Sequence, residues 1–126
     1  MPRRRRGWAL DHYDEQKIYH TPLTVSLLEP ALLILIKRQA RHGYTLLSDL
    51  EMLGMGTIHP SVVYRTLREM EELGWIVSEW TTDQTQGPPR RTYRITAEGD
   101  VALVNWQQEL KKSERLIAKL LQSVDS

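Results

Sequence analysis

The segment from Pro60 to Gly74 constrains the fold most, because it contains the start, the two faces and the end of one helix. Proline suits the first helical position, where its missing N–H is no loss, and glycine suits the left-handed residue after a helix. One face is apolar at helical spacing and consists of Val63, Leu67, Met70 and Leu73. The opposite face carries hydroxyl and guanidinium groups, from Ser61, Tyr64, Arg65 and Arg68.

The order of basic and acidic residues along this helix is the reverse of the order that the helix dipole favours. Two arginines occupy its first turns, whereas a solvated helix favours acidic residues first and basic residues last. The acidic residues gather near its end, at Glu69, Glu71 and Glu72. This order indicates that an anion meets the first two turns, and we interpret the segment as a DNA-recognition helix that begins at Pro60. A surface helix whose arginines are merely solvated is the alternative.

Composition limits the class of protein. The chain has 126 residues, which is typical of one domain or of one domain with an appended element. The formal charge is only +1, but arginines cluster at residues 3–6 and 90–91, which favours a localised anionic partner. The absence of cysteine excludes disulfides and thiolate metal sites, and it fits the reducing cytoplasm, where we expect the protein. No stretch approaches the roughly 18 apolar residues that span a membrane, so we expect no membrane association, and we expect no metal or cofactor.

Residues 1–25 are expected to form a basic N-terminal arm, since they lack hydrophobic periodicity. Basic arms of DNA-binding proteins enter a groove or contact phosphates. The candidates for such contacts are Arg3, Arg4, Arg5 and Arg6. A solubilising disordered tail is the alternative, and the sequence leaves it open.

Two helices are expected before the recognition helix. Residues 26–41 show capping-box spacing from Ser26 to Glu29 and are then apolar nearly all round, so this helix should be central to a bundle. The chain breaks at His42-Gly43, and residues 44–53 predict a shorter helix. The buried face of the shorter helix should consist of Leu46, Leu47, Leu50 and Leu53. Three helices with a short connection before the third match a helix-turn-helix.

Beyond Gly74 the hydrophobic period changes from 3.6 to 2. Residues 75–82 are rich in aromatic and β-branched side chains, residues 91–96 alternate, and a polar turn-forming loop separates them. The pair predicts a β-hairpin, and a hairpin directly behind a helix-turn-helix is a wing, here with Arg90 and Arg91 at its tip. Both arginines suit phosphates or the minor groove. We expect one of them to pair with Glu79 or Asp83, because strand alternation sends adjacent residues to opposite faces.

A heptad pattern marks the last helix, which Thr96 can cap and which runs from about residue 97 to residue 124. The seam consists of Leu103, Trp106, Leu110, Ser113, Ile117, Leu120 and Val124. An isolated helix with this seam exposes a long apolar strip, so it needs a partner. We favour self-association over packing on the chain's own core, because the three-helix core and the hairpin are expected to cover each other.

Trp106 and Ser113 suggest a ligand site within this seam. A large flat indole next to a small seam residue leaves a slot for a planar aromatic molecule at a dimer interface. The alternative is that Trp106 is simply part of the interface core.

The predicted fold is mainly α with a small β-hairpin. It is a winged helix-turn-helix over residues 26–96, followed by a C-terminal dimerisation helix over residues 97–126. Three motifs in this order resemble the PadR family of transcriptional regulators over about residues 27–124, namely His42-Gly-Tyr44, the segment 63–74 and the segment 87–99. The family's proline after the recognition-helix tyrosine is Arg65 here, and its glycine before that stretch is Ser61. The resemblance implies a dimeric winged-helix repressor of prokaryotic transcription, whose affinity for DNA a small ligand lowers.

The residue chemistry points to double-stranded DNA with a palindromic site as the partner. Arginine at the start of a recognition helix reads base edges in the major groove, and Arg65 is the best placed candidate. Ser61 and Tyr64 suit phosphate contacts, and Tyr44 can reach the backbone unless it is a core aromatic. The histidines are scattered and no serine lies in a nucleophile elbow, so we expect no catalysis. A winged helix that binds only proteins remains the alternative function.

Overall fold

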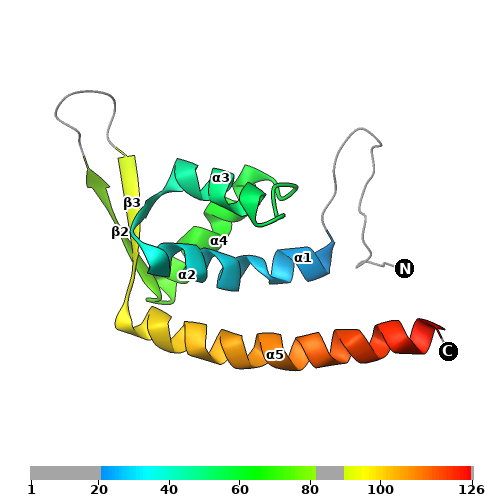
Figure 1. Ribbon diagram of the computed structural model, residues 1–126. Coiled ribbons are helices and arrows are strands. Elements are labelled where there is room, and N and C mark those ends of the chain that lie inside the picture. Colours follow the sequence, from blue (N-terminus) through cyan, green and yellow to red (C-terminus); the bar gives the residue numbers. More distant parts are fainter. Residues whose placement is uncertain (1–20, 82–89, 126) are drawn as a thin grey trace, which may run out of the picture.

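The computed structural model describes residues 21–81 and 90–125, so the predictions for Arg3 to Arg6 and for Asp83 lie outside it. The described residues form a helical body, a small sheet beside it and one long helix along its side (Figure 1). The fold is mainly helical with a winged helix-turn-helix, as predicted. The elements are α1 (Pro22–Ser26), α2 (Leu28–Arg38), β1 (Arg41–His42), α3 (Gly43–Met52), α4 (Pro60–Glu72), β2 (Ile76–Thr81), β3 (Arg90–Ile95) and α5 (Ala97–Asp125).

Helix α2 is the centre of the core, because its apolar residues point in nearly every direction. It packs against α3, α4, α5 and β3. Its buried residues are Leu28, Pro30, Ala31, Leu32, Leu33, Leu35 and Ile36. The predicted central position of this helix is therefore confirmed.

The predicted start of this helix is wrong. The Ser26 hydroxyl donates to the carbonyl of Leu23, earlier in the chain, at 2.7 Å. It therefore does not cap the helix that follows. Instead, a separate short helix α1 precedes α2, and the Thr21 hydroxyl caps α1 by accepting from the amide of Thr24 at 3.2 Å. Helix α2 then begins at Leu28 without a side-chain cap.

Helices α3 and α4 form the predicted helix-turn-helix, and each buries its apolar face except at the end. Val63, Leu67 and Met70 of α4 are at most 1% exposed. Leu73 is 57% exposed and Leu53 is 48% exposed, contrary to prediction, because each lies one residue beyond its helix and serves as the C-cap. After Leu73 the chain turns through Gly74 in the left-handed region, at φ 82°, as the sequence predicted.

The wing is part of a three-stranded antiparallel sheet in the order β1-β3-β2. Strands β2 and β3 form the predicted hairpin, with Ser78 opposite Tyr93. The sequence prediction missed β1, in which His42 lies opposite Thr92 and its ring Nδ1 lies 3.1 Å from the Thr92 hydroxyl. A two-residue strand is too short to show any periodicity. Its effect is to attach the start of α3 to the wing.

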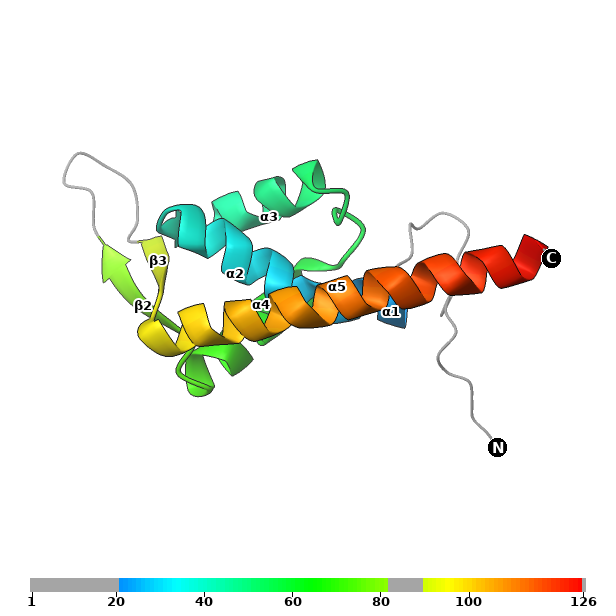
Figure 2. The same ribbon diagram turned by 60° about the horizontal axis from the view of Figure 1, so that its bottom comes forward.

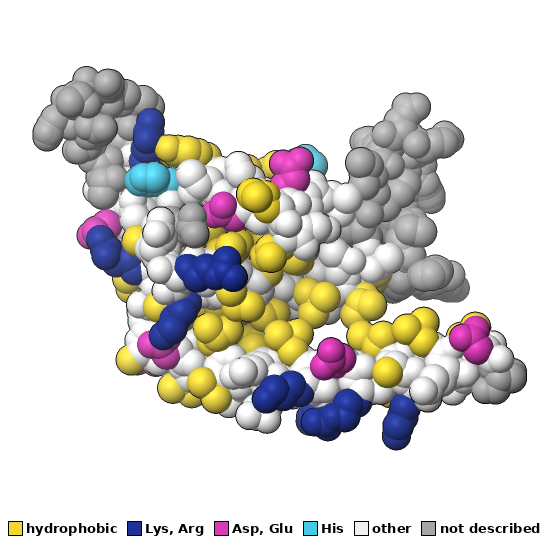
Figure 3. All heavy atoms as spheres, viewed as in Figure 1, with side chains coloured by type: hydrophobic (Ala, Val, Ile, Leu, Met, Phe, Trp, Pro, Cys, Tyr) yellow, Lys and Arg dark blue, Asp and Glu magenta, His cyan; other side chains and the backbone are white. Residues whose placement is uncertain are grey.

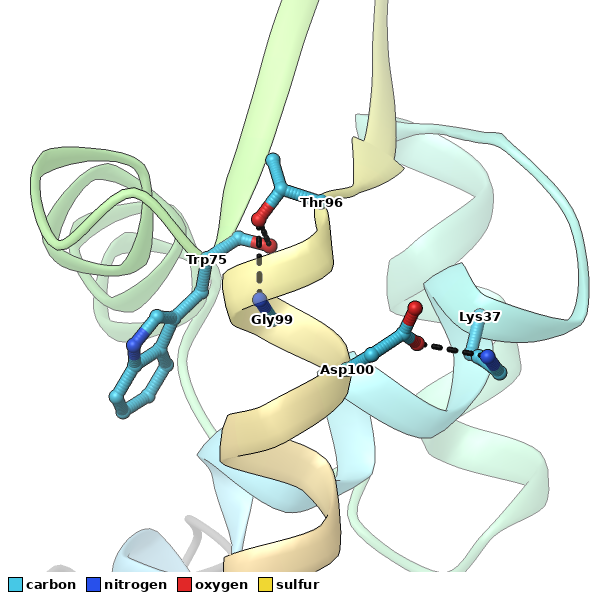
Figure 4. Close-up of polar contacts among 5 residues, drawn as sticks. All are labelled: Lys37, Trp75, Thr96, Gly99 and Asp100. Atoms are coloured by element: carbon cyan, nitrogen blue, oxygen red, sulfur yellow. Dashed lines mark hydrogen bonds and ion pairs between the residues drawn. The ribbon is translucent and has the colours of Figure 1, made fainter.

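Polar contacts join the first turn of helix α5 to the rest of the fold (Figure 4). The Thr96 hydroxyl accepts from the amide of Gly99 at 3.0 Å, which confirms the predicted cap. It also contacts the carbonyl of Trp75, which follows the end of α4. A side chain at Gly99 would collide with that carbonyl, so glycine permits this close approach. An ion pair of 2.7 Å between Asp100 and Lys37 ties the same turn to α2.

The first turns of α5 close the hydrophobic core, contrary to the expectation that the three helices and the hairpin cover each other. Ala102 is buried, and Leu103 and Trp106 pack against the core. Since α2 is apolar on almost every side, α3, α4 and the sheet leave one of its faces for α5 to cover. The rest of α5 extends past α1, where Ile117 is 41% exposed and Val124 is 79% exposed (Figure 2).

Candidate nucleic-acid interface

The exposed face of α4 forms one wall of the candidate interface. The opposite face of the helix is buried in the core, so this one must point outward. The residues predicted to lie on it are all exposed: Pro60, Ser61, Tyr64, Arg65 and Arg68. Within residues 21–81 and 90–125, neither Arg65 nor Arg68 forms an ion pair or a hydrogen bond, so both guanidinium groups are available to an external partner.

His59 is the N-cap of α4, a role that the sequence prediction missed. Its ring Nδ1 accepts from the amide of Ser61 at 3.0 Å and lies 2.9 Å from the Ser61 hydroxyl. This ring replaces the Ser, Thr, Asp or Asn side chain that usually caps a helix, which is why residue preferences did not reveal it. The cap satisfies one of the amide groups that the first turn of α4 leaves without a partner in the helix.

A hollow of about 520 Å³ adjoins this face, between the start of α3, the middle of α4 and the wing. Its polar lining combines guanidinium and phenol groups with one carboxylate, and its lining residues are Gly43, Tyr44, Tyr64, Arg68, Glu71, Trp80, Arg90, Arg91 and Tyr93. The structure therefore brings five of the predicted DNA-contacting side chains together around one concavity. The arrangement suits an anion, since cationic groups and hydroxyl donors converge there.

Two lining residues of the hollow have structural roles. A Cβ at Gly43 would lie 3.2 Å from the Tyr64 ring, so the missing side chain lets that ring lie against the start of α3. Tyr93 is buried in the middle strand, and this burial raises the pKa of its phenol. Tyr93 is therefore a neutral hydrogen-bonding group at physiological pH.

Tyr44 and Arg90 form a contact between α3 and the wing. The Arg90 guanidinium donates to the Tyr44 hydroxyl at 2.8 Å and lies 5.2 Å from the centre of the same ring. The His42 ring stacks on Tyr44 at 5.6 Å. Tyr44 is 50% exposed, which excludes the alternative of a core aromatic and places it at the rim.

Arg91 contacts α4 rather than its predicted partner across the hairpin. Its guanidinium lies 3.8 Å from a carboxylate oxygen of Glu71, and its Nε donates to the Ser78 hydroxyl at 3.0 Å. Glu79 pairs instead with Arg94, at 3.6 Å, so the predicted pair of Glu79 with Arg90 or Arg91 is wrong. Side-chain alternation relates only the residues of the two hairpin strands, so it did not show that α4 lies beside the hairpin.

A second, apolar region surrounds the predicted ligand slot on α5. Trp106 and Ser113 line the same groove of about 670 Å³, together with Leu110 and Ile117 of the seam. Leu23 and Leu27, from α1 and its end, form the opposite wall, and the sequence prediction assigned no role to them. Figure 3 shows hydrophobic side chains gathered between the helical body and α5. The groove is thus walled partly by the chain itself.

The exposed basic face of α4 beside a wing defines the class of the protein as a winged helix-turn-helix protein. Residues 32–105 match the PadR-like family of transcriptional regulators, and the chain belongs to this family. Comparison with curated proteins gave no match. No helix within the described ranges is long and apolar enough to cross a membrane.

Solved structures of transcriptional regulators share the fold. A PadR family regulator from Eggerthella lenta is 28% identical, with a TM-score of 0.68 over 79% of this chain and 85% of that one. A Streptococcus transcriptional regulator is 30% identical, with a TM-score of 0.65 over 77% of this chain and 95% of that one. A putative regulator from Thermoplasma acidophilum is 25% identical, with a TM-score of 0.71 over 79% and 95%. This chain is therefore similar to regulators over most of their length.

Proposed function

We propose that the protein is a dimeric repressor that binds a palindromic DNA operator in a sequence-specific manner. The observation that carries this proposal is the exposed face of α4, on which Arg65 and Arg68 are held outward without partners in the described structure. A recognition helix enters the major groove with its N-terminal residues first, and Arg65 lies in the second turn of α4. Membership of a family of transcriptional regulators supports the same function.

The individual contacts follow from the chemistry of each group. Arg65 reads a guanine edge, since arginine can donate two hydrogen bonds to guanine O6 and N7. Phosphate contacts fix register without reading sequence. They come from Tyr44, Ser61, Tyr64, Arg68, Arg90 and Arg91, with Pro60 at the start of the helix and Arg3 to Arg6 reaching the DNA from the arm.

Residues 97–126 serve as the dimerisation helix in this proposal, and residues 26–96 serve as the DNA-binding domain. The observation in support is the exposed apolar surface along the C-terminal half of α5, at Leu116, Ile117, Leu120, Leu121 and Val124. Covering this surface with the same helix of a second copy removes it from water. Because the first turn of α5 is bonded to Trp75 and α2, the dimer also sets the distance between the two α4 helices.

The expected result of selecting binding sites from random DNA is one inverted repeat bound by one dimer. Two-fold symmetry of the protein requires two half-sites whose centres are about one helical turn apart. Sequencing of the bound pool gives the site, and sedimentation of the complex gives the number of chains on it. Enrichment of a single unrepeated half-site with one chain bound would contradict the proposal.

A winged helix that binds only other proteins is the second candidate, since this fold alone does not prove DNA binding. That function does not depend on the α4 arginines as a set. Replacing both Arg65 and Arg68 by Ala therefore separates the candidates. A DNA-binding protein loses its affinity for nucleic acid, whereas a protein-binding module keeps its affinity for its protein partner.

We further propose that a planar aromatic molecule bound at Trp106 and Ser113 releases the operator. Both side chains line one groove that is bounded by seam residues of α5. A ligand there that favours a different spacing of the two subunits binds the DNA-free dimer better, and only this difference in affinity can release DNA. A tenfold loss of DNA affinity requires about 1.4 kcal/mol of such coupling.

Fluorescence of a variant that retains only Trp106 tests the ligand site, with Trp8, Trp75 and Trp80 replaced by Phe. Planar aromatic compounds are expected to quench the emission saturably. Operator DNA should shift the quenching curve to higher ligand concentration, since the coupling is reciprocal. No saturable quenching across a varied panel would leave Trp106 as a structural residue of the interface.

A further inference from the structure

Four side chains link the second half of α4 to the wing. The Ser78 hydroxyl donates to a carboxylate oxygen of Glu71 at 2.6 Å, and Arg91 donates to the same hydroxyl at 3.0 Å. The Arg91 guanidinium also lies 3.8 Å from the other carboxylate oxygen of Glu71. Its guanidinium carbon lies over the Trp80 ring, 5.3 Å from the ring centre. Arg91 is thus held on three sides, by an anion, a hydroxyl and an aromatic ring.

Glu71 is an acidic residue in a hollow that is otherwise lined by basic and aromatic side chains. Glu71 lies on α4 one turn after Arg68, and both side chains line the hollow beside the DNA-facing surface. A carboxylate there repels the phosphates that the surrounding arginines attract. Glu71 instead forms an ion pair with Arg91. The Glu71 side chain is 31% exposed and the Arg91 side chain is 42% exposed, so the pair is accessible to solvent and to an incoming polyanion.

We propose that Glu71 is a positioning residue that competes with the DNA backbone for Arg91 and so lowers sequence-independent affinity. The competition rests on geometry, since phosphate oxygens and the Glu71 carboxylate seek the same guanidinium protons. Ser78 bridges Glu71 and Arg91 by hydrogen bonds, and the Trp80 ring packs against the guanidinium group. Arg90, the neighbouring residue of the strand, donates to the Tyr44 hydroxyl of α3.

This inference rests on the proposed DNA-binding function, and its test uses the change from Glu71 to Gln. Glutamine keeps an oxygen that accepts from Ser78, but it removes the negative charge. An exposed ion pair contributes at most about 1 kcal/mol, so the affinity for random DNA should rise by up to about fivefold. Without the competing charge the phosphate contact of Arg91 is stronger, which should steepen the slope of log affinity against log salt by up to about 0.9.

The decisive comparison is made in a chain that also carries Arg91→Ala. If Glu71 acts through Arg91, Glu71→Gln no longer steepens the salt slope in that background. The matched control is Glu72→Gln, which removes the same charge from the neighbouring exposed position, where the described residues provide no ion pair. Thermal unfolding of each variant by circular dichroism verifies that the fold is intact.

Three outcomes are distinguishable in this experiment. A steeper slope for Glu71→Gln alone, absent with Arg91→Ala and absent for Glu72→Gln, supports the positioning role. An equal effect with and without Arg91, or no effect in either background, overturns that role while leaving DNA binding intact. Absence of salt-dependent DNA binding by the unmodified protein overturns both the positioning role and the proposed function.

Discussion

Replacing Leu110 and Ile117 together by Asp is expected to give a folded monomer that has lost most of its affinity for the operator. Both residues line the groove on α5, and Ile117 is 41% exposed in the single chain. In the proposed dimer each carboxylate is desolvated without a partner, which costs several kcal/mol per chain. In the monomer the same carboxylates remain partly in water, so the fold survives.

Loss of the dimer should affect DNA binding far more than any single contact does. A monomer binds only one half-site. In a dimer, binding of the first half-site makes binding of the second an intramolecular event, and this gain in affinity is lost in the monomer. Sedimentation measures the oligomeric state, and a mobility-shift titration on the selected operator measures affinity. A dimer of unchanged stability would place the interface elsewhere on the chain.

A matched control keeps the charge change but moves it to the other side of α5. Gln108→Asp combined with Lys119→Gln also lowers the charge by two, at exposed positions outside the groove lining. This variant should remain dimeric. Since Leu110 also lines the groove that faces α1, Leu120→Asp combined with Val124→Asp provides a second test, at residues that are 57% and 79% exposed.

The sequence predicted the fold well where a residue type acts locally. Pro60, Gly74 and Thr96 each mark an end of a helix, and each lies where the local rules place it. The apolar stripe of α4 is buried and its polar stripe is exposed, because helical periodicity alone decides which residues share a face. These predictions require no knowledge of distant parts of the chain.

The predictions failed where the outcome depends on packing between distant segments. One of the two wing arginines was expected to pair with Glu79 or Asp83 within the hairpin, but Arg91 pairs with Glu71, because α4 lies beside the hairpin. Trp106 was expected at a dimer interface, and the heptad pattern alone did not show that part of its surface packs on the chain's own core. One local prediction failed as well: the spacing from Ser26 to Glu29 suggested a cap, but the Ser26 hydroxyl donates to Leu23 within the short helix α1.

The candidate interface shows the same division. Exposure of Arg65 and Arg68 follows from the period of α4 and was predictable from the sequence. The hollow beside them was not, because it arises from the packing of Tyr64 against Gly43 and from the strand β1 that joins α3 to the wing. Periodicity places side chains on faces, but only tertiary contacts show which faces converge.

Arg65→Ala is expected to lower operator affinity by about 1–3 kcal/mol, which is a factor of about 5 to 150. The guanidinium forms no ion pair within the described ranges, so its removal leaves no buried partner behind and should not change stability. Arg115→Ala, which removes an exposed guanidinium from α5, is the matched control and should leave operator binding unchanged.

The ratio of operator affinity to random-DNA affinity, measured at one salt concentration for the unmodified protein and for Arg65→Ala, tests most directly whether α4 reads base sequence. The salt concentration must be fixed, because phosphate contacts make every affinity depend on it. We expect the ratio to fall with Arg65→Ala, since the lost contact discriminates between bases. An equal loss of affinity for both DNAs would show that Arg65 contacts only phosphate, and no loss for either would show that this face of α4 does not meet DNA.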